Sequence, residues 1–186
     1  MALHTLSVLV ENSPGVLARV ASLFSRRGYN IDSLAVGPTE NPSVSRMTIV
    51  LNLEGHALDQ VSAQLFKLVN VIGIQEMTER NSRQRELLFV KVATDSSSAA
   101  QVADLATKFG AKVISQGDKH SLIEAVGTNR ELSDLLVALE KFGIKELVQS
   151  GVIAVELGDA TLTERTAQET GLVSSESHAQ TEDYQN

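Results

Sequence analysis

Two amides and a glycine near the start of the chain are the residues best suited to hold a small molecule. Asn12 and Gly15 belong to the segment Asn12-Ser13-Pro14-Gly15, and Asn30 follows about one helix later. An amide side chain both donates and accepts hydrogen bonds, so a pair of amides suits the ammonium and carboxylate groups of a free amino acid. Gly15 has no Cβ and lets a ligand approach the backbone closely. The pattern indicates a binding site for a small polar molecule.

The same segment also has a purely structural interpretation. Ser13 is a residue type that caps helices, and Pro14 suits the first helical position, where no N–H is needed. A helix that begins here would in addition offer the backbone N–H groups of Gly15, Val16 and Leu17, together with about half a positive charge. Capping and ligand binding therefore remain alternatives at this point.

Hydrophobic periodicity predicts the elements that position these residues. The order is βαββαβ, with strands at 3–11, 31–37, 44–53 and 71–78 and helices at 14–28 and 57–69. The first helix is expected to bury one face and to end at Gly28 in a left-handed cap. The buried face of that helix comprises Val16, Leu17, Val20, Leu23 and Phe24.

The same order of elements returns in the second half of the chain. Strands are expected at 85–94, 111–116, 119–127 and 144–157, and helices at 97–109 and 130–142. An offset of 82 aligns Gly28 with Gly110, and an offset of 74 aligns Leu65 with Leu139. We interpret this as a duplicated unit. The alternative is one open α+β sandwich without internal symmetry.

The duplication provides an internal control for the polar residues. At the offset of 82, the residues that correspond to Asn12, Gly15 and Asn30 are Thr94, Ser97 and Lys112. The second copy therefore has neither the two amides nor the glycine. If these residues served only to build the unit, the second copy would need them too. This difference favours a ligand site in the first copy alone, and it leaves the second copy without a pocket.

The expected fold class is α+β, with two ferredoxin-like βαββαβ units and a disordered acidic tail. The first unit covers 1–79, a polar linker 80–84, the second unit 85–158 and the tail 159–186. Of the net charge of −7, residues 158–186 carry −5. Few apolar residues follow Gly158, so we expect no stable structure there.

Several classes of chemistry are excluded or disfavoured. The chain has no cysteine, and its four histidines (His4, His56, His120 and His178) are scattered without metal-ligand spacing. No set of nucleophile, base and orienting residue is evident. The body of the chain lacks the basic stripe of a nucleic-acid-binding protein, and no apolar run is long enough to span a membrane. We expect no metal, no nucleic acid, no membrane and a cytoplasmic location.

The first unit resembles a known family over most of its length. The segments "ENSPGVLARV", "LFSRRGYNI", "SLAVGPTE" and "SRMTI" occur in the order and spacing of the ACT domain in the regulatory small subunits of acetolactate synthase, also called acetohydroxyacid synthase. The similarity continues through "LVNVIGIQEM", "RELLFVKV" and "SGVIAVELG" and so reaches Gly158.

The resemblance implies a regulatory subunit without an active site. It implies a homodimer of side-by-side ACT domains, with valine at the seam, contacting Asn12, Gly15 and Asn30 and the backbone of Val16 and Leu17. It further implies a catalytic large subunit that holds thiamine diphosphate, Mg²⁺ and FAD, while this chain holds no cofactor. The small subunit would activate that partner and confer valine feedback inhibition in the synthesis of valine, isoleucine and leucine.

Some assignments stay open. Ile31 and Leu34 are candidates for the wall around the valine side chain, but core packing is the favoured interpretation for each. The connection 38–45, with Arg46 beyond it, is a candidate contact for the large subunit and otherwise a plain loop. The rival interpretations are a stand-alone amino-acid sensor that controls another enzyme or transcription, and a small ferredoxin-like enzyme.

Overall fold

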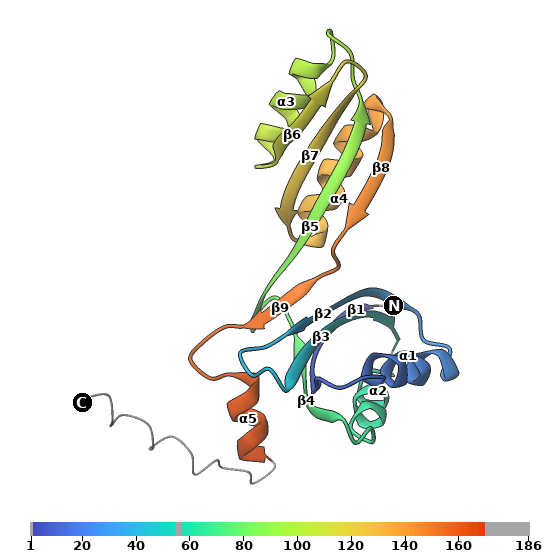
Figure 1. Ribbon diagram of the computed structural model, residues 1–186, viewed down its shortest axis with the longest axis vertical. Coiled ribbons are helices and arrows are strands. Elements are labelled where there is room, and N and C mark those ends of the chain that lie inside the picture. Colours follow the sequence, from blue (N-terminus) through green and yellow to red (C-terminus); the bar gives the residue numbers. More distant parts are fainter. Residues whose placement is uncertain (1, 55–56, 170–186) are drawn as a thin grey trace, which may run out of the picture.

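Two antiparallel sheets, joined end to end, form the frame of the protein (Figure 1). The structure, a computed structural model, describes residues 2–54 and 57–169. The described residues do not include His56 or His178. They also leave out residues 170–186, which belong to the tail predicted to be disordered.

The first unit contains the sheet order β2-β3-β1-β4, with α1 and α2 packed on one face. Its elements are β1 (Ala2–Glu11), α1 (Val16–Arg26), β2 (Ile31–Pro38), β3 (Val44–Leu53), α2 (Ala57–Leu65) and β4 (Val71–Met77). Val8 and Phe24, both almost fully buried, represent the core between sheet and helices. Helix α2 ends four residues earlier than predicted, at Leu65.

The second unit repeats this arrangement with the order β6-β7-β5-β8. Its elements are β5 (Ser82–Ala93), α3 (Ala99–Lys108), β6 (Lys112–Gly117), β7 (His120–Gly127), α4 (Asn129–Leu139), the 3₁₀ turn η1 (Glu140–Phe142) and β8 (Ile144–Gln149). A separate core around Leu88, Ile123 and Leu139 fills the space under α3 and α4. Two cores on two sheets confirm the duplicated βαββαβ fold and exclude a single sandwich.

Corresponding helices end in the same way, which supports the alignment of the two units. Gly28 has φ +70° and Gly110 has φ +66°. The N–H of Tyr29 donates to Phe24 O at 3.1 Å, and the N–H of Ala111 donates to Ala106 O at 2.8 Å. These are the bonds of a Schellman motif, in which a left-handed glycine closes the helix. The sequence prediction for Gly28 is therefore confirmed.

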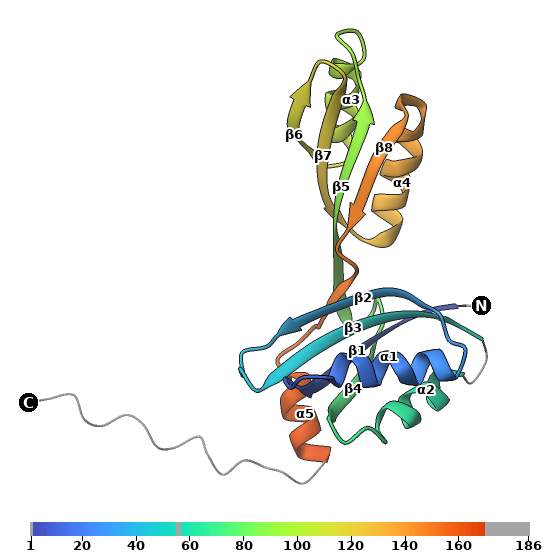
Figure 2. The same ribbon diagram turned by 45° about the vertical axis from the view of Figure 1, so that its right-hand side comes forward.

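The connection between the units differs from the predicted linker 80–84. Strand β5 starts at Ser82 and pairs over Ser82–Arg85 with β9 (Ile153–Glu156). The predicted strand 144–157 is accordingly two strands, β8 and β9, separated at Gly151. We call the paired segments 82–85 and 153–156 the ribbon; Figure 2 shows it between the two sheets.

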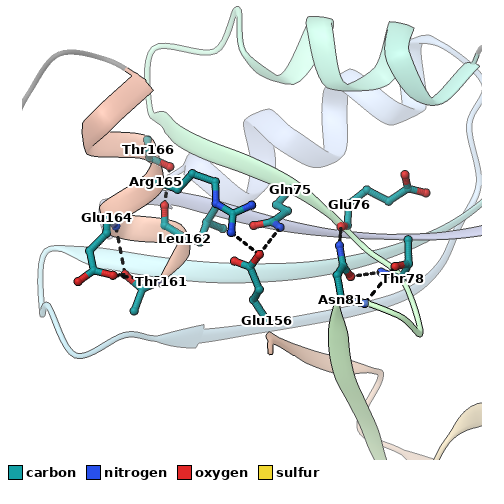
Figure 3. Close-up of polar contacts among 10 residues, drawn as sticks. All are labelled: Gln75, Glu76, Thr78, Asn81, Glu156, Thr161, Leu162, Glu164, Arg165 and Thr166. Atoms are coloured by element: carbon teal, nitrogen blue, oxygen red, sulfur yellow. Dashed lines mark hydrogen bonds and ion pairs between the residues drawn. The ribbon is translucent and has the colours of Figure 1, made fainter. Parts of the chain in front are cut away.

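The ribbon and a C-terminal helix cover the second face of the first sheet. Helix α5 (Leu162–Glu169) forms where we expected no structure. Buried Thr166 lies so close to Gly73 of β4 that a Cβ built on this glycine would be 2.3 Å from Thr166 Oγ1. On the ribbon, Glu156 accepts from Gln75 Nε2 at 2.9 Å and pairs with Arg165 of α5 (Figure 3). The chain beyond Gly158 is thus part of the fold as far as Glu169.

One direct contact joins strand β2 to the chain between the units. The N–H of Val152 donates to Ser33 Oγ at 2.9 Å. Next to it, a Cβ on Gly151 would lie 3.0 Å from the carbonyl oxygen of Leu34. Glycine suits this position for two reasons. A Cβ would be tightly placed against the backbone of β2, and the φ of +81° is one that other residues rarely adopt.

Candidate functional site

The corner between β1 and α1 is held by backbone and amide contacts with the connection between β2 and β3. The N–H of Asn12 donates to Ser43 O at 2.7 Å, and Asn12 Nδ2 donates to Pro42 O at 2.9 Å. The sequence predicted that Asn12 and Gly15 lie at the same corner, and the structure places both there, exposed. The connection 38–45 thus lies beside the candidate site.

Ser13 does not cap the helix, contrary to the structural interpretation of the motif. Gly15 occupies the N-cap position with φ +85°, and no side chain bonds to the helix start. The left-handed backbone at Gly15 delays the helix to Val16, so Ser13 lies too far upstream and supplies only its carbonyl, to Val16 N–H at 3.4 Å. No atom lies within 4 Å of a Cβ built on Gly15, so the corner is open.

The N-terminus of α1 differs from those of three other helices. In the turn just before α3, Asp95 Oδ1 accepts from the N–H groups of Ser97 and of the N-cap residue Ser98, both at 2.9 Å, although no side chain caps α3 itself. Helices α4 and α5 begin with reciprocal capping pairs, in which Glu131 and Glu164 bond the N–H of the residue before the helix. Helix α1 has neither a capping side chain nor an acid in its first turn. A carboxylate is therefore the complement that this helix end lacks.

The second copy fills the same place from its own chain. Asp95 corresponds to Ser13 at the offset of 82. Its hydrogen bonds with the Ser97 and Ser98 hydroxyls and N–H groups lower its pKa from 3.8 to about 2. A cavity of about 320 Å³ lies beside it, lined by Ala93, Thr94, Asp95, Ser98, Lys141 and Phe142. This hollow is open to solvent and lacks the amides and the glycine of the first unit, and the charge of Asp95 opposes an incoming carboxylate there.

Asn30 lies at the other end of α1 and not beside Asn12. Its Nδ2 donates to Asp32 Oδ1 at 2.7 Å, and the side chain is exposed. The 11 residues of α1 place its two ends about 16 Å apart. Within one chain, the structure therefore does not bring the two amides together.

The apolar candidates divide between core and surface. Val16 is buried, so only its backbone can face a ligand, and Ile31 and Leu34 pack partly buried against the first core. Leu17, which we predicted on the buried face of the helix, is exposed. The helical period places Leu17 at the edge of the face that Val16, Val20 and Phe24 bury, in the first turn of the helix.

A polar network next to the corner was not anticipated from the sequence. Arg19 Nη1 on α1 donates to Asn70 Oδ1 at 2.6 Å, and Asn70 Nδ2 donates to Glu11 at the end of β1. The N–H of Glu11 also donates to Asn70 O at 2.9 Å. The network holds the end of β1, the start of β4 and the middle of α1 together behind the site. The one sequence signal for this network is Asn70 itself, a polar residue between a predicted helix and a predicted strand.

Two further classes of site have no support in the described part of the chain. Within residues 2–54 and 57–169, no three acidic or histidine side chains gather as a metal ion would require. None of the described helices is both long and apolar enough to cross a membrane.

Two antiparallel βαββαβ units, the first with an open helix start beside an exposed edge strand, define a protein of the ACT-domain class. The family model of the small-subunit-like ACT domain of acetohydroxyacid synthase matches residues 6–73. The model of the acetolactate synthase small subunit matches residues 85–158.

Similar proteins agree with both models. The chain is 53% identical to the acetolactate synthase small subunit of Mycolicibacterium smegmatis over 155 residues, covering 83% of this chain and 91% of that protein. It is 41% identical to a probable small subunit of Archaeoglobus fulgidus, covering 84% and 98%. The crystal structure of the small subunit from Thermotoga maritima matches with a TM-score of 0.78 at 30% identity, covering 86% and 100%. The chain belongs to the acetolactate synthase small-subunit family.

Proposed function

We propose that the α1 corner binds free valine and that this binding regulates the large catalytic subunit of acetolactate synthase. As a member of the small-subunit family, the chain has a non-catalytic, regulatory role. The observation that carries the proposal for the ligand is the N-terminus of α1, which lacks the carboxylate that Glu131 and Glu164 bring to α4 and α5 and that Asp95 brings to the turn before α3.

In this proposal the valine carboxylate takes the place that Asp95 occupies in the second unit. Its oxygens accept from the N–H groups of Gly15 and Leu17, where the open corner lets them approach, and compete with Ser13 O for the N–H of Val16. Asn12 contacts the polar groups of the ligand from the end of β1. The isopropyl group rests on Ile31, although discrimination from a ligand with one more methylene is worth only about 1–3 kcal/mol.

The site requires a second copy of the chain, because Asn12 and Asn30 lie at opposite ends of α1. Strand β2 is the outermost strand of the first sheet, so its free edge can pair with β2 of another copy. A side-by-side dimer of this kind brings Asn30 of one chain towards the Asn12 corner of the other. We therefore place valine at the seam of a homodimer, where each ligand contacts two chains.

Regulation follows if valine favours one arrangement of the dimer over another. A coupling of about 1–3 kcal/mol between effector and catalytic subunit is typical of such systems. Without valine the small subunit activates its partner, and with valine it lowers the activity. Thiamine diphosphate, Mg²⁺ and FAD belong to the large subunit in this scheme, and a cytoplasmic location remains a prediction.

The test combines direct binding with activity. Calorimetry of the full chain with valine is expected to show binding that Asn12→Ala and Asn30→Ala each weaken by roughly tenfold, as expected when buried polar groups lose a partner. The same variants should leave the large subunit active at valine concentrations that inhibit the wild-type complex.

The matched control is Asn129→Ala, which removes an exposed amide from the first turn of α4 in the second unit. It should bind valine as the wild type does. If Asn12→Ala and Asn30→Ala also bind normally while folded, the proposed pocket is wrong. If valine binds but the activity of the large subunit never responds, the chain is a stand-alone sensor instead.

A further inference from the structure

The ribbon between the two units has one buried face and one bare face. On the buried face, Ala154 and Ser82 lie against the first sheet, and Glu156 bonds Gln75 and Arg165 (Figure 3). The register pairs Arg83 with Val155 and Arg85 with Ile153, so these four side chains share the opposite face. Leu157 continues the same side of the strand. We call Arg83, Arg85, Ile153, Val155 and Leu157 the ribbon face.

The apolar side chains of the ribbon face are exposed in the single chain. Ile153 is 61% exposed, Val155 57% and Leu157 54%. The segment Val152 to Leu157 is apolar on both faces except for Glu156. A strand with one face in water normally alternates apolar and polar residues, whereas a strand without alternation is covered on both sides. The composition of β9 therefore fits a second cover that this chain does not provide within its described residues.

The bare surface extends beyond the ribbon onto the second sheet. Helices α3 and α4 lie on the same side of that sheet (Figure 1), and no helix of the described residues covers the other side. On that side, half-buried Phe89 of β5 is paired with Val148 of β8, which is 54% exposed. Single exposed apolar residues are ordinary, but a continuous set of this kind marks an interaction surface.

The charges on the ribbon face indicate which partner fits it. Arg83 and Arg85 flank the apolar strip, and the pKa of Glu131 is lowered by its bonds to Thr128 and, to a smaller extent, by these two arginines. The carboxylate of Glu131 already bonds Thr128 at the start of α4, and Arg85 Nη1 donates to Gln84 O at 2.8 Å. Exposed Arg83 is therefore the stronger complement for a carboxylate from outside, with the charge of Arg85 beside it. In a symmetric contact between two copies the arginines of both ribbons would meet, and like charges oppose that arrangement.

We propose that the ribbon face docks an apolar segment of the large catalytic subunit that carries carboxylates beside it. This inference rests on the proposed function in so far as it requires the large subunit as partner. The apolar strip supplies the buried centre of the contact, and Arg83 and Arg85 form charged pairs at its rim. The ribbon face lies between the first and the second unit. A change in how these two units are held together therefore changes the surface that the large subunit contacts.

The experiment uses the full chain and purified large subunit. Val155→Asp adds a charge to the strip, and its place opposite Arg83 lets the variant keep the ribbon paired. We expect the association with the large subunit, measured by sedimentation or calorimetry, to weaken by roughly tenfold or more, as for a central interface residue. Val155→Thr, which keeps a β-branched side chain, should weaken it by a smaller factor. The double variant Arg83→Glu, Arg85→Glu should weaken it most at low salt.

The control is Val137→Asp on α4, which changes a valine that is 66% exposed and far from the ribbon face. It should associate as the wild type does. Valine binding to the isolated chain should be unchanged in every ribbon variant, so the two proposals fail separately. If the wild type does not bind the large subunit, the proposed function is wrong.

Other results would overturn the docking proposal alone. It is wrong if Val155→Asp and Val155→Thr both bind the large subunit like the wild type. It is also wrong if the variants instead change the oligomeric state of the isolated chain, because the ribbon face then contacts a second copy. If the variants bind the large subunit like the wild type once residues 170–186 are removed, the ribbon face contacts this tail and not the large subunit.

Discussion

The contact between Gly73 and Thr166 makes the docking of α5 on the first sheet directly testable. A Cβ on Gly73 would lie 2.3 Å from Thr166 Oγ1, 3.1 Å from its Cγ2 and 3.2 Å from its Cβ. The first distance is too short for a real contact and the other two are tight, so Gly73→Ala requires the Thr166 side chain to rotate or α5 to move away from β4. Overpacking of this kind costs about 1–3 kcal/mol, against roughly 0.5–1 kcal/mol gained because alanine suits a strand better than glycine.

A double-mutant cycle isolates this contact from other effects of the substitutions. Thr166→Ala removes the two nearest atoms and loses the bond from Thr166 Oγ1 to Leu162 O at 2.8 Å. With both substitutions present the clash is relieved, so the coupling energy should favour the pair by about 1–3 kcal/mol.

The assay is hydrogen exchange of the α5 amides, supported by denaturant unfolding, because a chain of two units need not unfold in one step. Gly73→Ala should speed exchange in α5 by roughly 5- to 30-fold, and the double variant should restore it. The control is Gly37→Ala in β2, where no atom lies within 4 Å of the new Cβ. If the two substitutions are additive within about 0.5 kcal/mol, α5 does not pack on Gly73 and the three-layered first unit is incorrect.

Further predictions concern stability and its dependence on pH. Because the folded pKa of Asp95 is lowered from 3.8 to about 2, its stabilising contribution is complete above pH 4 and lost as the pH falls towards 2; Asp95→Asn should remove that part of the acid dependence in unfolding curves recorded from pH 5 to 2. Thr128→Ala breaks the capping box of α4 and should lower the free energy of unfolding by about 0.5–2 kcal/mol in denaturant titrations, and an unchanged midpoint would contradict the cap. Ser33→Ala leaves the nearly buried N–H of Val152 without its acceptor, so unfolding should become easier by about 1–3 kcal/mol, while Ser150→Ala at the exposed end of β8 serves as comparison.

The duplicated fold was predictable because burial on one face leaves a clear period in the sequence. Val20 and Phe24 on α1, and Leu132 and Leu139 on α4, repeat at helical spacing and are all buried. The glycines at positions 28 and 110 marked the helix ends for a physical reason, since both adopt a left-handed backbone.

The features that were missed leave no such period. Helix α5 is held by Leu162, by Thr166 against a glycine and by the ion pair between Arg165 and Glu156, so its apolar signal is weak. The ribbon was taken for a linker because its residues before Glu86 are polar, although Ser82 is buried there.

The positions of the candidate residues were predictable, whereas their use as a ligand site stays a prediction. Asn12 and Gly15 share a corner and Asn30 lies past the far end of α1, as a helix of 11 residues between them requires. The bonds of Asp95 to the N–H groups before α3 became visible only from the structure, because an Asp before a helix is common in any sequence.

Strand β5 has a mechanical consequence for the way one half of the molecule influences the other. It is a single strand of 12 residues that pairs with the ribbon at one end and with the centre of the second sheet at the other. At about 3.3 Å per residue it works as a lever arm of roughly 40 Å. A tilt of only about 5° at its base would swing its tip by roughly 3 Å over that length. A small adjustment of the first unit at the base of β5 would thus become a displacement as large as an atom at the far end.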